Sequence, residues 1–269
     1  MKHRARAAGL VFCLVSALLA SQGIARAADA LPRPTPTVAT SESVPTGWTF
    51  SVSAYAWAAG LDGRVRTLPP LPAVDISMSI GDVLQNLDGA LMGLIEARNG
   101  PWMVMADLVY SKVSPGKNFA VSGFNGAANL DSQAFIGLAA VGYRLFEHQR
   151  VSVDGFVGAR LWALDNTLTV TVPGVGSVDY GKSKSWVDGV IGGRVMLHLT
   201  DKLFASVIGS VGGLAAEVEW DIYAGLNYAF TERWSAFAGY RALHVDYKSG
   251  NFLYDATQHG PVLGVAARF

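Results

Sequence analysis

The chain has 269 residues, of which 51% are hydrophobic and only 16% are charged. Its 21 Lys and Arg balance its 21 Asp and Glu. No run of basic residues stands out, so nucleic acid is not an expected partner. Cys13 is the only cysteine, which excludes an intrachain disulfide as the source of stability.

The N-terminal residues have the pattern of a secretory signal peptide. Lys2, Arg4 and Arg6 form a positive region, residues 10–20 form a short apolar segment, and residues 25–27 form an A-x-A cleavage site. We expect cleavage after this site, which makes residues 1–27 the signal peptide. The mature chain would keep 17 basic and 21 acidic residues, a net charge of 17 − 21 = −4, and no cysteine.

The next segment predicts a tail ahead of one folded domain. Residues 28–47 are rich in Pro, Ser and Thr, which favours a disordered periplasmic tail. Residues 48–269 contain no apolar run of helix length. An exported apolar chain of this kind is either a soluble all-β domain or a closed β-barrel that spans the outer membrane.

Alternating apolar and polar residues predict ten strands in a closed antiparallel transmembrane β-barrel. Their expected spans are 48–59, 90–98, 102–112, 132–146, 150–165, 185–199, 203–212, 219–230, 234–248 and 258–269. Short turns near residues 100, 148, 201 and 232 alternate with long connections at 61–89, 113–131, 166–184, 213–218 and 249–257. Short periplasmic turns and longer outer loops are typical of bacterial barrels.

The long connections leave the number of strands open at eight, ten or twelve. Residues 64–79 are expected to form a hairpin that extends the first two strands or adds a further pair. Residues 79–89 are expected to form a helical turn at the barrel mouth, and residues 167–172 are expected to extend a strand beyond the membrane.

Charged residues fall on the strand face opposite the apolar one, which in a membrane barrel is the face of the lumen. A Lys or Arg placed toward lipid would cost about 2–4 kcal/mol near the midplane. The predicted luminal charges are Glu96, Arg98, Asp107, Arg144, Asp154, Arg160, Asp188, Arg194, Asp221, Arg241 and Arg268. Five acids against six arginines favour a plug of ion pairs, and an ion-selective pore is the alternative.

Aromatic residues are expected to form two girdles that bracket the apolar belt. The periplasmic set is Trp48, Trp102, Tyr143, Phe146, Tyr228, Phe230, Trp234 and Phe269, and the looser outer set is Tyr110, Trp162, Trp186, Trp220 and Tyr240. Girdles favour a membrane barrel over a soluble one, whose aromatic residues would lie in the middle of its core face.

These features together resemble a known family. Residues 48–269 resemble small Gram-negative outer-membrane β-barrels of the OmpA/OmpW-like class, through the terminal Phe269 and the stretches 97–100 (ARNG), 142–144 (GYR) and 239–241 (GYR). The resemblance implies outer-membrane localisation and contact with outer-membrane lipid. It also implies that the last strand carries the signal read by the barrel-insertion machinery. The signal residues would be Leu263, Val265, Ala267 and Phe269, with Ala267 standing where the class often has an aromatic residue.

The sequence offers little support for catalysis. His244 and Asp246 share one strand face near an outer loop, and an oriented imidazole of this kind is what a surface hydrolase would need. The histidines have no metal-ligand spacing, and no nucleotide-binding motif is present. We therefore expect no catalytic residues, no metal and no cofactor. The expected role is structural or surface-interactive, and the alternatives are a narrow channel for small solutes and, less favoured, a barrel-borne hydrolase.

Overall fold

The computed structural model describes residues 47–121, 124–174 and 176–269. The predicted signal peptide and all but the last residue of the predicted tail lie outside these residues. No helix among the described residues is long and apolar enough to cross a membrane.

Ten antiparallel strands form a closed ring, as the sequence predicts. The ring closes where Ser51–Trp57 of the first strand pair with Arg268–Val262 of the last. The ring strands are β1 (Trp48–Trp57), β4 (Leu87–Asn99), β5 (Trp102–Val113), β7 (Phe124–His148), β8 (Val151–Val172), β9 (Gly176–His198), β10 (Leu203–Gly212), β11 (Val218–Ala229), β12 (Trp234–Ser249) and β13 (Phe252–Arg268).

The outer surface of the ring is an apolar belt. Val157 on β8, Ile191 on β9 and Leu263 on β13 point outward and are 57%, 60% and 63% exposed. In a soluble domain such exposure would be costly, whereas in lipid it is the favourable arrangement. The alternation of apolar and polar residues along each strand therefore determines which of its faces is the lipid-facing one.

Three strands outside the ring and one helix build the outer end. These elements are β2 (Gly60–Arg66), β3 (Val74–Met78), α2 (Ile80–Gln85) and β6 (Gly116–Val121). Strand β2 continues β1 and pairs with β13, and β3 pairs with β2. Residues 64–79 thus form most of a hairpin that continues β1 outward and places β3 where β4 would continue, and the hairpin adds no pair of strands to the ring.

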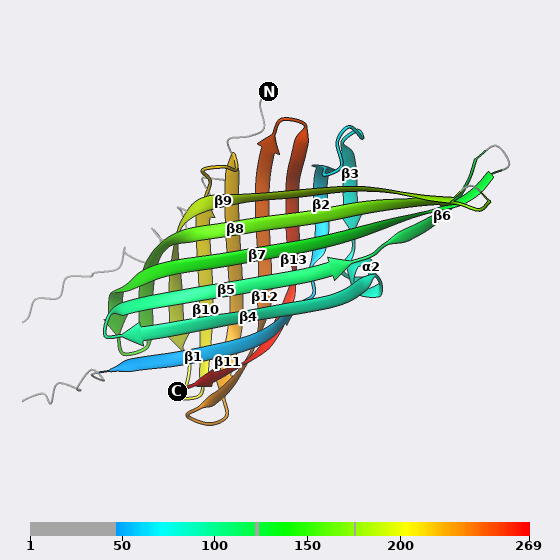
Figure 1. Cartoon of the computed structure of the whole chain (residues 1–269). Coiled ribbons are helices and arrows are strands. Elements are labelled where there is room, and N and C mark those ends of the chain that lie inside the picture. Colours follow the sequence, from blue (N-terminus) through cyan, green and yellow to red (C-terminus); the bar gives the residue numbers. More distant parts are fainter. Residues whose placement is uncertain (1–46, 122–123, 175) are drawn as a thin grey trace, which may run out of the picture. The chain divides into compact units, whose positions relative to one another are not determined.

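Two predicted connections are largely strand. Strands β8 and β9 pair without interruption from Val151↔Leu197 to Val172↔Gly176, across most of residues 166–184. Strand β6 pairs with β7 within residues 113–131. Figure 1 shows β7, β8 and β9 reaching well past the other ring strands on one side. The extension at residues 167–172 was expected, but its continuation through β9 was not.

Above the belt the ring separates into two facing sheets. One sheet contains β4, β5, β7, β8 and β9, and the other contains β12, β13, β2 and β3. They separate because β10 ends at Gly212, opposite Val190, so among the described strands none pairs with the outer part of β9 on that side. A cluster of buried apolar side chains fills the space between the sheets, which gives the outer half of the lumen a core like that of a β-sandwich.

The predicted outer aromatic girdle is wrong for two residues. Trp162 and Trp186 are 1% and 5% exposed and belong to this buried cluster. They share a strand face with the luminal charges, so alternation directs them inward. Tyr240 lies on the outer surface at 50% exposure.

Candidate functional site: the filled lumen

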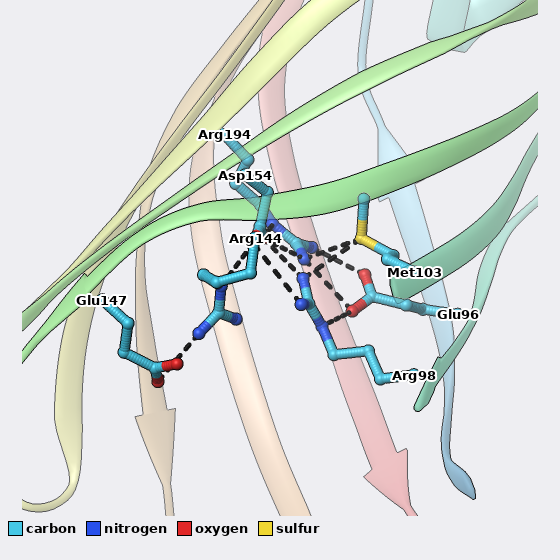
Figure 2. A network of polar contacts seen from close by, with 7 residues as sticks. All are labelled: Glu96, Arg98, Met103, Arg144, Glu147, Asp154 and Arg194. Atoms are coloured by element: carbon cyan, nitrogen blue, oxygen red, sulfur yellow. Dashed lines mark hydrogen bonds and ion pairs between the residues drawn. The ribbon is translucent and has the colours of Figure 1, made fainter. Parts of the chain in front are cut away.

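An ion-pair network fills the lumen near the short turns. Asp154, only 1% exposed, accepts hydrogen bonds from Arg98, Arg144 and Arg194. Glu96 pairs with Arg98 at 2.8 Å and with Arg194 at 2.6 Å. We call Glu96, Arg98, Arg144, Asp154 and Arg194 the lower network. Their side chains come from β4, β7, β8 and β9 and point toward one another in the lumen (Figure 2).

The local pairing explains part of this network. Asp154 on β8 lies directly opposite Arg144 on β7 and Arg194 on β9, so adjacent strands bring opposite charges together. Glu96 and Arg98 reach the same point from β4, across the lumen. The Sδ atom of Met103 lies 3.1 Å from Arg98 Nη2 and 3.0 Å from Arg194 Nη2. Carboxylates and sulfur thus surround the buried guanidinium groups.

A second network fills the middle of the lumen. Arg160 contacts Glu219 and Asp221, both at 2.8 Å, and Arg241 contacts Asp221 at 2.8 Å and Asp107 at 2.9 Å. We call Asp107, Arg160, Glu219, Asp221 and Arg241 the middle network. The Tyr55 hydroxyl extends it by donating to Asp107 at 2.6 Å, and the Trp162 indole extends it by donating to Glu219 at 2.8 Å.

Positive and negative charges are equal in number over the two networks. The lower network has three arginines and two acids, and the middle network has two arginines and three acids. The sum is five positive against five negative charges, and in the lower network Arg144 also pairs with Glu147 at 2.8 Å. A lumen of this kind has no single-sign field to draw in ions.

Asp188 has a different role from the one expected. It is fully buried and lies opposite Arg160 in the strand pairing. Its Oδ1 atom instead accepts the backbone N–H groups of Leu214, Ala215 and Ala216 at 2.8–2.9 Å. Its Oδ2 atom accepts the Trp186 indole N–H at 3.0 Å. Asp188 therefore holds the loop between β10 and β11 against β9.

We expect Asp188→Ala to lower the free energy of unfolding by about 2–3 kcal/mol, because it leaves three backbone N–H groups, including that of the buried Ala216, without their acceptor. Hydrogen exchange should accelerate most at residues 214–216. Asp179→Ala, a change in the extended part of β9, is the matched control and should alter neither quantity. Unchanged exchange at 214–216 would contradict the assigned role of Asp188.

The outer half of the lumen is closed by aromatic rings. Trp186 stacks on Trp162 with ring centroids 5.6 Å apart and on Tyr247 with centroids 4.0 Å apart. These rings reach across from β8 and β9 to β12, where Leu243 and Val245 are fully buried. We call Trp162, Trp186 and Tyr247, with the apolar residues packed around them, the aromatic layer.

The structure places the predicted luminal charges as follows. Nine of the eleven belong to the two networks, Asp188 holds a loop, and Arg268 is exposed near the C-terminus. Glu219 was missed, although it has the same parity as Asp221 on β11. It was missed because the strand was expected to begin at that residue.

The residues of the suggested hydrolase face outward. His244 Nδ1 lies 3.0 Å from the Thr257 hydroxyl, and Asp246 pairs with Lys248 at 3.1 Å. Trp220 lies beside the imidazole of His244. Within the described part of the chain, His244 and Asp246 are not bonded to each other, and no cluster of three or more metal-ligating side chains occurs.

A different histidine is joined to an acid on the same outer surface. His259 Nδ1 lies 2.7 Å from the Tyr240 hydroxyl, and its Nε2 lies 3.1 Å from Asp62. Ser77 also donates to Asp62 at 2.6 Å, and the hydrogen bonds from Ser77 and His259 lower the pKa of the Asp62 carboxyl. These four residues come from β12, β13, β2 and β3, so their hydrogen bonds join the β2–β3 hairpin to the barrel wall.

No protein-family model and no curated protein matches the sequence. Among solved structures, the chain is similar to the outer membrane protease OmpT from Escherichia coli, with a TM-score of 0.52 at 10% identity over 84% of this chain and 98% of that one. The translocator domain of the autotransporter NalP from Neisseria meningitidis gives a TM-score of 0.44 at 12% identity, covering 83% and 89% of the two chains. Ail of Yersinia pestis gives 0.31 at 14% identity, covering 83% and 99%.

At these identities the similarity concerns the fold alone. Three observations lead to the same assignment. They are the closed ring of ten antiparallel strands, the apolar belt, and the similarity to OmpT over 98% of the OmpT chain. The chain therefore has the fold of a small outer-membrane β-barrel.

Proposed function

We propose that this barrel is a closed envelope protein, whose role is structural or depends on surface interactions rather than on passage of solutes along its axis. The observation that carries the proposal is the filling of the lumen by three successive layers. The lower network, the middle network and the aromatic layer lie one above the other between the short turns and the outer end.

The layers block the axis for different physical reasons. The two networks bury charged groups that form ion pairs with one another, so an ion entering them would have to displace a charged partner. The aromatic layer offers no polar surface to a hydrated solute. A ring of ten strands also lies near the size at which side chains alone fill the interior.

The extended strands support a role at the cell surface. On β8, Thr167, Thr169 and Thr171 alternate with Leu168 and Val170 well beyond the ring. A structure of this length outside the membrane is not needed to close the barrel. It is available to contact other molecules, and the proposal assigns no particular partner to it.

We expect the refolded mature chain to give no discrete conductance steps in a planar lipid bilayer. Folding is checked beforehand by heat-modifiable migration on a gel, and protein-free bilayers provide the baseline. Reproducible steps from protein that migrates as folded would overturn the closed-barrel proposal. They would favour the narrow channel, whose conductance should then change in Arg160→Gln.

A further inference from the structure

The barrel wall is forked on one side. Strand β1 pairs with β4 only as far as Ala54↔Gly93. Beyond that point residues 87–92 of β4 pair with β5 alone, and β3 lies beside β2 in the place where β4 would continue. Among the described residues no ladder joins β3 to β4. The ring is therefore continuous near the short turns and open between β3 and β4 farther out.

The helix α2 connects the two arms of the fork and is held at its ends. At its start the Ser79 hydroxyl accepts from Asp82 N at 3.2 Å, and the Asp82 carboxylate accepts from Ser79 N at 2.9 Å. Past its end, the Asn86 carbonyl accepts from Ser114 N at 2.9 Å. None of the residues of α2 is buried, and Leu84 is 51% exposed. A helix of six residues with so little buried surface belongs to the least stable part of a fold.

The base of the fork lies at the outer boundary of the apolar belt. On β13 the outward residues change from Leu263, which is 63% exposed, to His259, which pairs with Gly60 at the start of β2. On β4 the outward Leu91 is 74% exposed. The backbone N–H of Trp57 donates to Met92 Sδ at 3.2 Å at this point, where the ladder ends. The fork thus opens at the outer end of the apolar belt, beside side chains that suit contact with lipid.

Apolar side chains line the inside of the fork. Leu61, Ile76 and Met92 are half-buried and pack against the core of the outer half. Val74, on the same face of β3 as Ile76, is 51% exposed. A lining of this kind suits a hydrocarbon chain and offers little to a polar molecule.

From these observations we propose that α2 is a lid over a lateral port, and that the acyl chain of an outer-leaflet lipid enters the fork between β3 and β4. Displacing α2 breaks no strand ladder and exposes no buried helix residue. The port lies at the side of the packed outer core and away from the barrel axis. It is therefore compatible with an axis that stays closed to ions.

The test is photolabelling of the whole refolded barrel in vesicles that contain a lipid with a diazirine on its acyl chain. Fragment mass spectra assign the labelled residues. We expect label on Ile76 and Met92 as well as on the lipid-facing Leu263 and Val265. Leu138, which points inward from β7 behind an intact ladder, should carry none. Absence of label on Ile76 and Met92, as on Leu138, would overturn the proposal.

A capping variant tests the lid itself. Ser79→Ala combined with Asp82→Ala removes both capping bonds, so it should raise the label on Ile76 and Met92 about fivefold. Label on Leu263 should stay the same. Ser183→Ala combined with Asp165→Ala is the matched control, because it removes another exposed Ser–Asp hydrogen bond, between β9 and β8, and it should leave the label on Ile76 and Met92 unchanged. Equal labelling of the capping variant and the original chain would show that α2 is not a lid.

Discussion

Replacing Asp154 by alanine is expected to lower the free energy of unfolding by about 3–5 kcal/mol, since it leaves buried arginines without their shared partner. Asp154 contacts Arg98, Arg144 and Arg194 and is only 1% exposed. After its removal only Glu96 remains at the centre of the lower network. A loss of this size is a large part of the stability of a typical domain.

The measurement is equilibrium unfolding by guanidinium of the barrel reconstituted in vesicles, followed by gel mobility. Asp75→Ala is the matched control. The Asp75 side chain is 88% exposed and lies 3.8 Å from Arg64, so its loss should cost about 0.5 kcal/mol or less. Asp154→Asn separates charge from shape, because it keeps an acceptor of similar size and removes the charge. A loss below about 1 kcal/mol for Asp154→Ala would contradict the central place of this residue.

Alternation of apolar and polar residues was sufficient to predict the ring and the side of each strand that faces the lumen. The prediction succeeded because lipid excludes most charged side chains. Over the whole belt, one face of each strand must therefore be apolar, and charged residues are confined to the other. Asp154, Arg194 and Arg144 are also direct neighbours across adjacent strands. In a barrel whose strands pair in chain order, such pairs of opposite charges on adjacent strands can be predicted as soon as the register of the two strands is known.

Partners across the lumen could not be predicted in the same way. Arg160 lies opposite Asp188 in the strand pairing, yet its charged partners are Glu219 and Asp221 on β11. That choice depends on the stagger of the strands around the barrel, which has no local sequence signal. Asp188 instead accepts hydrogen bonds from three backbone N–H groups of a loop. These donors come together only when the loop has folded, so the sequence does not indicate them.

The outer end departs from expectation for a related reason. Above the belt neither lipid nor a closed ring constrains the strands, so alternation no longer shows which strands will pair. The pairing of β2 with β13 joins residues 60–66 to residues 253–259, and nothing near residues 60–66 marks it. Trp162 and Trp186 were assigned to a girdle by their position along the strands, while their parity already directed them inward.

The aromatic layer gives the second large effect. We expect Trp186→Ala to lower the free energy of unfolding by about 3–5 kcal/mol, as large-to-small changes in a packed core do. Trp186 is 5% exposed and stacks on both Trp162 and Tyr247, so its loss leaves two rings facing a cavity. The same guanidinium titration measures it. Trp102→Ala is the control: this indole is 56% exposed and contacts Tyr143 edge to face, and its loss should cost about 1 kcal/mol.

The Trp186 variant also separates the layers that close the axis. Removing the indole opens the aromatic layer, but the lower and middle networks remain in series with it. We therefore expect the folded Trp186→Ala variant to be less stable than the original chain and still to give no conductance steps in a planar bilayer. Conductance steps from this variant alone would mean that the ion-pair networks leave a path for water, and that the aromatic layer is what closes the barrel.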